Sequence, residues 1–127
     1  MRGFFVFLGV VLLLGATWNK MVVKEGLVAR LDAKPKTAGA AGQLFVLARY
    51  YDFLDRPKKA LPIYQRIVDR YPDSPHGLDA LHGLASALEK TKDYKQSLKE
   101  YQRFLEKYPG SKYEVSVRNN VDILKSL

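Results

Sequence analysis

An internal repeat constrains the fold of this chain more than any other feature of its sequence. Seven positions in one stretch recur 37 residues later with the same or a similar residue. The first set is Leu44, Leu47, Ala48, Ala60, Tyr64, Tyr71 and Pro72, and the second is Leu81, Leu84, Ala85, Ser97, Tyr101, Tyr108 and Pro109. Self-similarity at a period of roughly 20–50 residues indicates stacked structural units.

Apolar residues within each unit follow helical spacing. In the second unit they are Leu81, Leu84, Ala85 and Leu88, followed by Leu98, Tyr101, Phe104, Leu105 and Tyr108. Spacing of three and four residues predicts an amphipathic helix, so each unit is predicted to be two antiparallel helices joined by a turn. Small residues at matching places in the two helices, such as Ala48 and Ala60, allow the helices to approach closely. The predicted fold class is all-α.

The order of these residues resembles the tetratricopeptide repeat: leucine and a small residue, then a small residue, an aromatic residue and a proline. The resemblance covers residues 41–109 and extends to the links YPDSP and YPGSK, which are similar to those of bacterial envelope proteins with such repeats. It departs from the usual period of about 34 residues, and Ser97 stands where alanine is usual. The implied repeat core is Leu47, Ala48, Ala60, Tyr64, Pro72, Leu84, Ala85, Ser97, Tyr101 and Pro109.

The same resemblance implies a concave groove that binds partner proteins and is lined by the first helix of each pair. The groove residues it points to are Phe45, Arg49, Asp52, Phe53, Asp79, His82, Ser86 and Glu89. Phe45 and Phe53 are the strongest candidates for partner contacts, because they share one helix stripe and the repeat core does not need them. The alternative is that both rings pack against an N-terminal segment of the same chain. Some family members grip acidic chaperone tails with Lys and Asn, but Phe45 and Arg49 hold those positions here.

Both repeat boundaries carry helix-start signals. Ser74 and Pro75 suit an N-cap and a first helical position, and Ser111 with Glu114 forms a capping-box pattern. We therefore predict a final helix at about 112–127, within a C-terminal segment 110–127. Asp122 and Lys125 would make its outer face polar, so this helix is expected to cap the stack.

The chain begins with a segment typical of membrane targeting. Fourteen uncharged residues from Gly3 to Ala16 follow Arg2, which fits the apolar stretch of roughly 7–15 residues in a cleaved signal peptide. The stretch could also continue to Val23, giving the roughly 20 residues of a membrane span. We favour a retained anchor over residues 1–23, because Leu14-Gly15-Ala16 is a poor cleavage site. Cleavage would instead give a secreted periplasmic protein.

Residues 24–43 are expected to form a basic juxtamembrane segment and linker. The first 40 residues hold six basic and two acidic side chains, so net positive charge is densest there. Such side chains can contact anionic lipid headgroups. The positive-inside tendency places the repeats in the cytoplasm, whereas the two-residue N-tail resembles an export signal and places them in the periplasm. We expect the periplasmic orientation.

Other functional classes find little support. The chain has no cysteine, which excludes thiol nucleophiles and thiolate metal sites. Its two histidines, His76 and His82, are expected to be loop and surface residues, and no metal, cofactor, catalytic site or nucleic-acid partner is predicted. The expected function is a non-catalytic adaptor that contacts other protein subunits of a membrane or envelope complex. A structural subunit docked mainly through its membrane helix is the alternative, and an oligomer or larger complex is expected to support so small a core.

Overall fold

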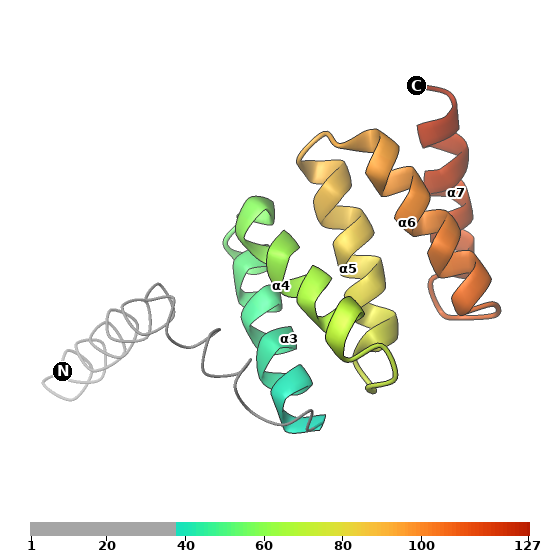
Figure 1. The fold of residues 1–127 in the computed structure, drawn as a ribbon. Coiled ribbons are helices and arrows are strands. Elements are labelled where there is room, and N and C mark those ends of the chain that lie inside the picture. Colours follow the sequence, from blue (N-terminus) through green and yellow to red (C-terminus); the bar gives the residue numbers. More distant parts are fainter. Residues whose placement is uncertain (1–37) are drawn as a thin grey trace, which may run out of the picture. The chain divides into compact units, whose positions relative to one another are not determined.

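The computed structural model describes residues 38–127, and within them every regular element is an α-helix. The helices are α3 (Ala38–Phe53), α4 (Pro57–Arg70), α5 (Gly77–Lys90), α6 (Tyr94–Lys107) and α7 (Glu114–Lys125). Figure 1 shows them following one another in chain order. The predicted anchor at residues 1–23 lies outside the described residues. None of the described helices is both long and apolar enough to cross a membrane.

Each helix packs mainly against its neighbours in the chain. The substantial contacts within 38–127 join α3 to α4, α4 to α5, α5 to α6 and α6 to α7. This is the packing expected of repeats that bury a continuous core by stacking. The all-α repeat fold predicted from the 37-residue period is therefore confirmed for this part of the chain, with α3–α4 as unit one and α5–α6 as unit two.

The repeat core forms largely where the sequence predicts it. Eight of its members are at most 5% exposed: Leu47, Ala48, Ala60, Tyr64, Leu84, Ala85, Ser97 and Tyr101. Ser97, the departure from alanine, donates a hydrogen bond of 2.8 Å from its hydroxyl to the Ala85 carbonyl oxygen. Serine therefore keeps the close helix contact and satisfies its own buried hydroxyl.

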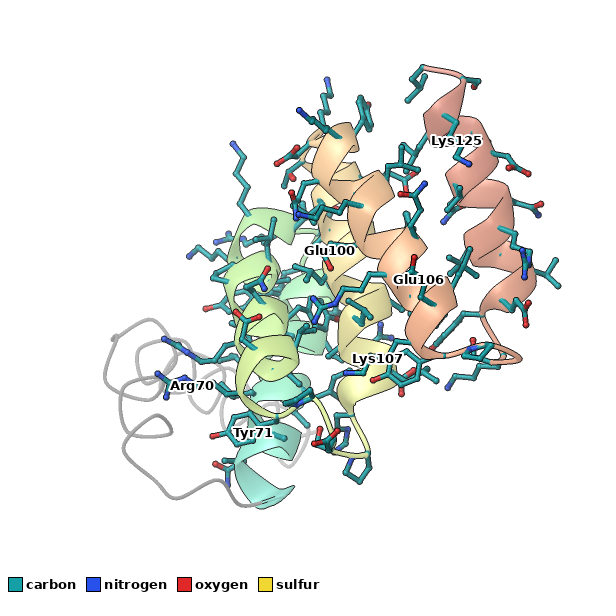
Figure 2. The ribbon with its side chains drawn as sticks, turned by 45° about the vertical axis from the view of Figure 1, so that its right-hand side comes forward. Arg70, Tyr71, Glu100, Glu106, Lys107 and Lys125 are labelled. Carbon is teal, nitrogen blue, oxygen red and sulfur yellow. The ribbon has the colours of Figure 1, made fainter. Side chains whose placement is uncertain are left out.

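Assigning Pro72 and Pro109 to the core was wrong. Pro72 is half-buried and Pro109 is exposed. Each follows the residue that ends a helix, Tyr71 after α4 and Tyr108 after α6. Figure 2 labels Tyr71 at that end of α4. Proline is common there because it cannot continue a helix, so these residues stop the second helix of each unit without filling its interior.

Helix α5 begins later than the Ser74-Pro75 signal predicts. Its N-cap is His76 and its first residue is Gly77, while the Ser74 hydroxyl is buried without a hydrogen bond among the described residues. The chain instead turns back, with the Gly77 N–H donating to the Ser74 carbonyl at 3.0 Å. A Cβ at Gly77 would lie 2.5 Å from the Pro72 carbonyl oxygen. This close approach requires glycine and fixes the first residue of the helix.

Helix α3 begins earlier than predicted, because it includes the last six residues of the expected linker 24–43. Ala40 and Ala41 are 3% and 0% exposed. Alanine has the highest helix propensity, and burial here adds the packing that the sequence alone does not show. The end of the expected linker, residues 38–43, is thus part of the first helix of unit one.

Helix α7 is the last helix of the described stack, over Glu114–Lys125. The polar outer face expected of a cap forms only in part, because Val115 and Ile123 are also exposed. Its buried side is Val117, Val121 and Leu124, while Asp122 and Lys125 are exposed. Ser111 does not bond the Glu114 amide through its side chain. It accepts a hydrogen bond from the Tyr113 N–H at 3.3 Å, and the Glu114 carboxylate accepts one from the Gly110 N–H at 2.7 Å. The predicted capping box is therefore replaced by two separate hydrogen bonds around the turn.

Candidate functional site

The candidate site is the surface formed by the predicted groove residues of α3 and α5, which we call the first-helix face. Its most regular feature is a tyrosine–carboxylate hydrogen bond in each unit. The Tyr64 hydroxyl donates to Asp52 in unit one, and the Tyr101 hydroxyl donates to Glu89 at 2.9 Å in unit two. Because each tyrosine comes from the second helix, each bond ties the two helices of a unit together.

Burial and the neighbouring carboxylate set the protonation of these tyrosines. Burial raises the pKa of Tyr64 far above its usual value of 10.0, and Asp52 raises it further. Burial likewise raises the pKa of Tyr101, with Glu89 adding to the shift. Both hydroxyls therefore stay protonated at neutral pH and act as donors. Their bonds hold the two carboxylates in fixed positions on the first-helix face.

Stacked aromatic rings form a second feature that repeats with the 37-residue period. Phe45 stacks on His76 with ring centroids 5.0 Å apart, and His82 stacks on Tyr113 at 4.1 Å. Phe45 also meets Tyr64 edge-on at 6.4 Å. His76 and His82 are thus partly buried in ring clusters, and the expectation of loop and surface histidines was incomplete.

The His82 cluster includes a charged group from α5 and two residues from the turn before α7. Asp79 accepts a hydrogen bond from the Tyr113 hydroxyl at 2.7 Å and lies 3.3 Å from the Lys112 ammonium. Burial acts to raise the pKa of Asp79, but the hydrogen bonds from Tyr113 and Lys112 outweigh it and the pKa is lowered. Burial lowers the pKa of His82, with Asp79 opposing the shift and Arg49 and Lys112 adding to it.

The two candidate phenylalanines differ in their surroundings. Phe45 is half-buried, because His76 and Tyr64 pack against it. Phe53 is 87% exposed at the end of α3. Phe45 therefore contributes to contacts within its own domain, and Phe53 has the larger exposed apolar surface. A role of either ring in partner binding stays a prediction.

The remaining groove residues differ between the units. In unit one, the Arg49 guanidinium lies 3.8 Å from the Asp52 carboxylate. In unit two, Ser86 occupies the position equivalent to Arg49. Here a pocket of about 330 Å³ opens beside Glu89, and its lining residues come from α5, α6 and α7. They are Ser86, Glu89, Lys90, Tyr94, Tyr101 and Asn120.

Sequence reasoning missed His76, Tyr113 and Lys112 as parts of this face, and Tyr94 and Asn120 as parts of the pocket. The repeat contained a signal for the first two, because His76 and Tyr113 are separated by the same 37 residues as Phe45 and His82. Within residues 38–127, no group of three or more His, Cys, Asp or Glu residues could hold a metal ion.

The helix pairs, the small residues at their crossings and the carboxylates on one face define a helical-repeat protein. The tetratricopeptide repeat family model matches residues 44–74 and 79–111. These two matches cover half of the chain, which belongs to the tetratricopeptide repeat family. Domains of this family generally bind other proteins and serve as non-catalytic scaffolds. No curated protein and no solved structure gives a significant match to the chain.

Proposed function

We propose that this protein is a membrane-anchored adaptor that holds another protein of a membrane or envelope complex on its first-helix face. The observation that carries the proposal is the combination of Phe53, 87% exposed, with charged groups that buried tyrosines hold in place. Aromatic residues are enriched in protein interfaces, and polar groups that are held in place before binding lower the entropic cost of association.

The anchor belongs to the proposal because of the sequence that precedes the repeats. The uncharged run from Gly3 to Ala16 supports membrane attachment,. We place the repeats in the periplasm, following the similarity of their links to those of envelope proteins. Extraction of membranes at alkaline pH tests the attachment, because a spanning protein stays in the membrane fraction. Intact-mass measurement of the extracted protein with a mature N-terminus near Thr17 would refute a retained anchor.

Partner capture tests the first-helix face. The full chain with a C-terminal tag is purified from detergent-solubilised membranes, and the captured proteins are compared with those of Phe53→Ala. Val115→Ala is the matched control, because Val115 is also exposed, at 75%, but lies on α7. We expect Phe53→Ala to lose the partner and Val115→Ala to keep it, with helicity unchanged in both. Equal capture by the two variants would show that the partner binds elsewhere.

A further inference from the structure

The pocket beside Glu89 lacks the arginine that lies at the equivalent place in unit one. Every residue lining it has a counterpart 37 positions earlier, so the two places can be compared side chain by side chain. Arg49 in unit one corresponds to Ser86 in unit two, Asp52 to Glu89, and Tyr64 to Tyr101. The tyrosine–carboxylate bond is the same in both units. The residue next to the carboxylate changes, and so do three other lining positions, where Lys90, Tyr94 and Asn120 correspond to Phe53, Pro57 and Gly83.

In unit one, the Asp52 carboxylate attracts the cationic side chain of Arg49. Its guanidinium approaches Asp52 to 3.8 Å while its side chain stays 66% exposed. It also interacts with the Tyr64 hydroxyl, and this interaction acts to lower the pKa of Tyr64. The tyrosine and the carboxylate together therefore form a site for a cation, and unit one fills this site from its own chain.

Unit two meets the tyrosine with neutral groups, because Asn120 and Ser86 interact with the Tyr101 hydroxyl, and within the described residues it leaves the carboxylate without a cation. Among residues 38–127 no ion pair reaches Glu89, although Lys90 is itself one of the residues that line the pocket. The small Ser86 side chain leaves a pocket of about 330 Å³, much larger than the roughly 30 Å³ that one water molecule occupies. The partly exposed Tyr94 ring, at 40%, forms another part of the lining. A planar cation is attracted both by a carboxylate and by an aromatic face.

We propose that the pocket lined by Ser86, Glu89 and Tyr94 binds an arginine side chain of the partner protein. The guanidinium takes the place that Arg49 takes in unit one, with Glu89 as its carboxylate acceptor. This inference rests on the proposed adaptor function and specifies which partner side chain the first-helix face recognises. Arginine fits better than lysine, because the guanidinium is planar and can use the carboxylate and a ring face together.

Titration with short peptides tests the pocket directly. The isotope-labelled full chain in neutral detergent micelles is titrated with acetyl-Gly-Arg-Gly-amide and followed by NMR. We expect the amide signals of Glu89, Tyr94 and Asn120 to shift. The citrulline peptide, which has the same shape without the charge, should bind at least about tenfold more weakly, as expected for a charge-assisted hydrogen bond. Equal binding of the citrulline or lysine peptide would overturn the assignment of a guanidinium.

Exchanging residues between the repeats provides the matched variants. Ser86→Arg installs the unit-one arrangement and should abolish binding, because the chain then supplies its own guanidinium. Glu89→Gln keeps an acceptor for the Tyr101 hydroxyl, so the fold is retained, and should weaken binding about tenfold. Arg49→Ser should open a second site, with new shifts at Asp52 and Phe53. Unchanged binding in Ser86→Arg and Glu89→Gln, with native spectra, would refute the pocket.

Capture experiments separate this inference from the proposed function. If the tagged wild-type chain retains a partner that Ser86→Arg and Glu89→Gln also retain, the adaptor function stands and the arginine pocket is refuted. If the wild-type chain captures no protein from membranes while the peptide still binds beside Glu89, the adaptor function is refuted and the pocket chemistry stands. Loss of the partner in both variants, but not in Val115→Ala, supports both.

Discussion

The two repeats share a framework but present different side chains on it. Both have a tyrosine–carboxylate bond, a stacked ring pair and a left-handed residue in the turn between their helices. The side chains that project from this framework are different, with Arg49 replaced by Ser86 and Phe53 by Lys90. The shared contacts therefore specify the fold, and the differing positions are those at which the two units can differ in what they bind.

Substitutions should destabilise the protein most where the two helices of a repeat touch through small residues. Ala85 is fully buried next to Ser97, which bonds its carbonyl oxygen. Ala85→Phe should cost about 1–3 kcal/mol by overpacking, and Ala48→Phe should cost a similar amount in unit one. Thermal unfolding followed by circular dichroism measures both. An unchanged melting temperature in either variant would contradict the equivalence of the two helix crossings.

Substitution at the contact between the two repeats should have the next largest effect on stability. A Cβ at Gly83 would lie 2.5 Å from Cζ of the fully buried Tyr64 ring. Gly83→Ala should therefore destabilise the protein by about 1–2 kcal/mol, because the clash outweighs the gain of roughly 1 kcal/mol in helix propensity.

Gly39→Ala is the control for this substitution, because a Cβ at Gly39 meets nothing within 4 Å. It should leave stability unchanged or raise it slightly. Urea unfolding of both variants gives the comparison. A Gly83→Ala protein as stable as Gly39→Ala would show that Tyr64 can move aside without cost.

Substitution in the turns within the repeats should have a smaller effect on stability, and it should stabilise the protein. Lys92 has φ of 65° and its counterpart Asp55 has φ of 53°. Lysine is disfavoured in this left-handed region, whereas aspartate tolerates it. Lys92→Gly should therefore stabilise the protein by up to about 1 kcal/mol, because relief of the left-handed strain exceeds the entropy that glycine adds to the unfolded chain, and Asp55→Gly should stabilise it by less. Equal gains, measured by urea unfolding, would mean that aspartate brings unit one no advantage at this turn.

The smallest expected effect is a pH dependence that arises from His82 in unit two. Burial lowers the pKa of His82 below its usual 6.5, so the unfolded chain binds a proton more readily than the folded one. The resulting stability is fully present above about pH 6.5 and is lost as the pH falls through the lower, folded pKa. The charged groups facing His82 are Asp79, Arg49 and Lys112.

His82→Phe gives unit two the residue that unit one has at the equivalent position, Phe45. The variant therefore lacks the group that binds this proton. The wild-type protein should lose stability as the pH falls from about 6.5, and the variant should lose less over the same interval. Asp79, whose pKa is lowered from 3.8, contributes only at more acidic pH, so the two contributions separate. Urea unfolding at a series of pH values measures the difference, and parallel curves for both proteins would exclude His82 as the source.

The sequence predicts the helices and their buried sides because periodicity reports directly on which side of a helix is apolar. Leu84, Ala85 and Tyr101 are predicted from their spacing and are buried. The start of α5 was not predictable in this way, because the contact that demands Gly77 comes from the backbone of Pro72 and exists only in the folded turn. Local signals at Ser74 and Pro75 are also compatible with the turn that forms instead.

The candidate site was predicted only in part. The resemblance identified the face that holds Asp52 and Glu89, but not their tyrosine partners, because no spacing rule links a carboxylate to a hydroxyl 12 residues away. The His82–Tyr113 stack joins residues 31 positions apart and depends on how the turn before α7 folds. The 37-residue offset relates His76 to Tyr113, but applied to the predicted groove residues it leads to neither of them, so the repeat did not assign these two rings to the face.

The packing of each helix mainly on its chain neighbours has a mechanical consequence. The last helix, α7, is joined to the described stack chiefly through α6, so a force applied at the C-terminus acts on one interface at a time. Such a chain should peel helix by helix from that end, with each step absorbing a small extension while the units nearer the N-terminus keep their shape. A partner that pulls on this protein would therefore meet a graded resistance instead of a single abrupt rupture.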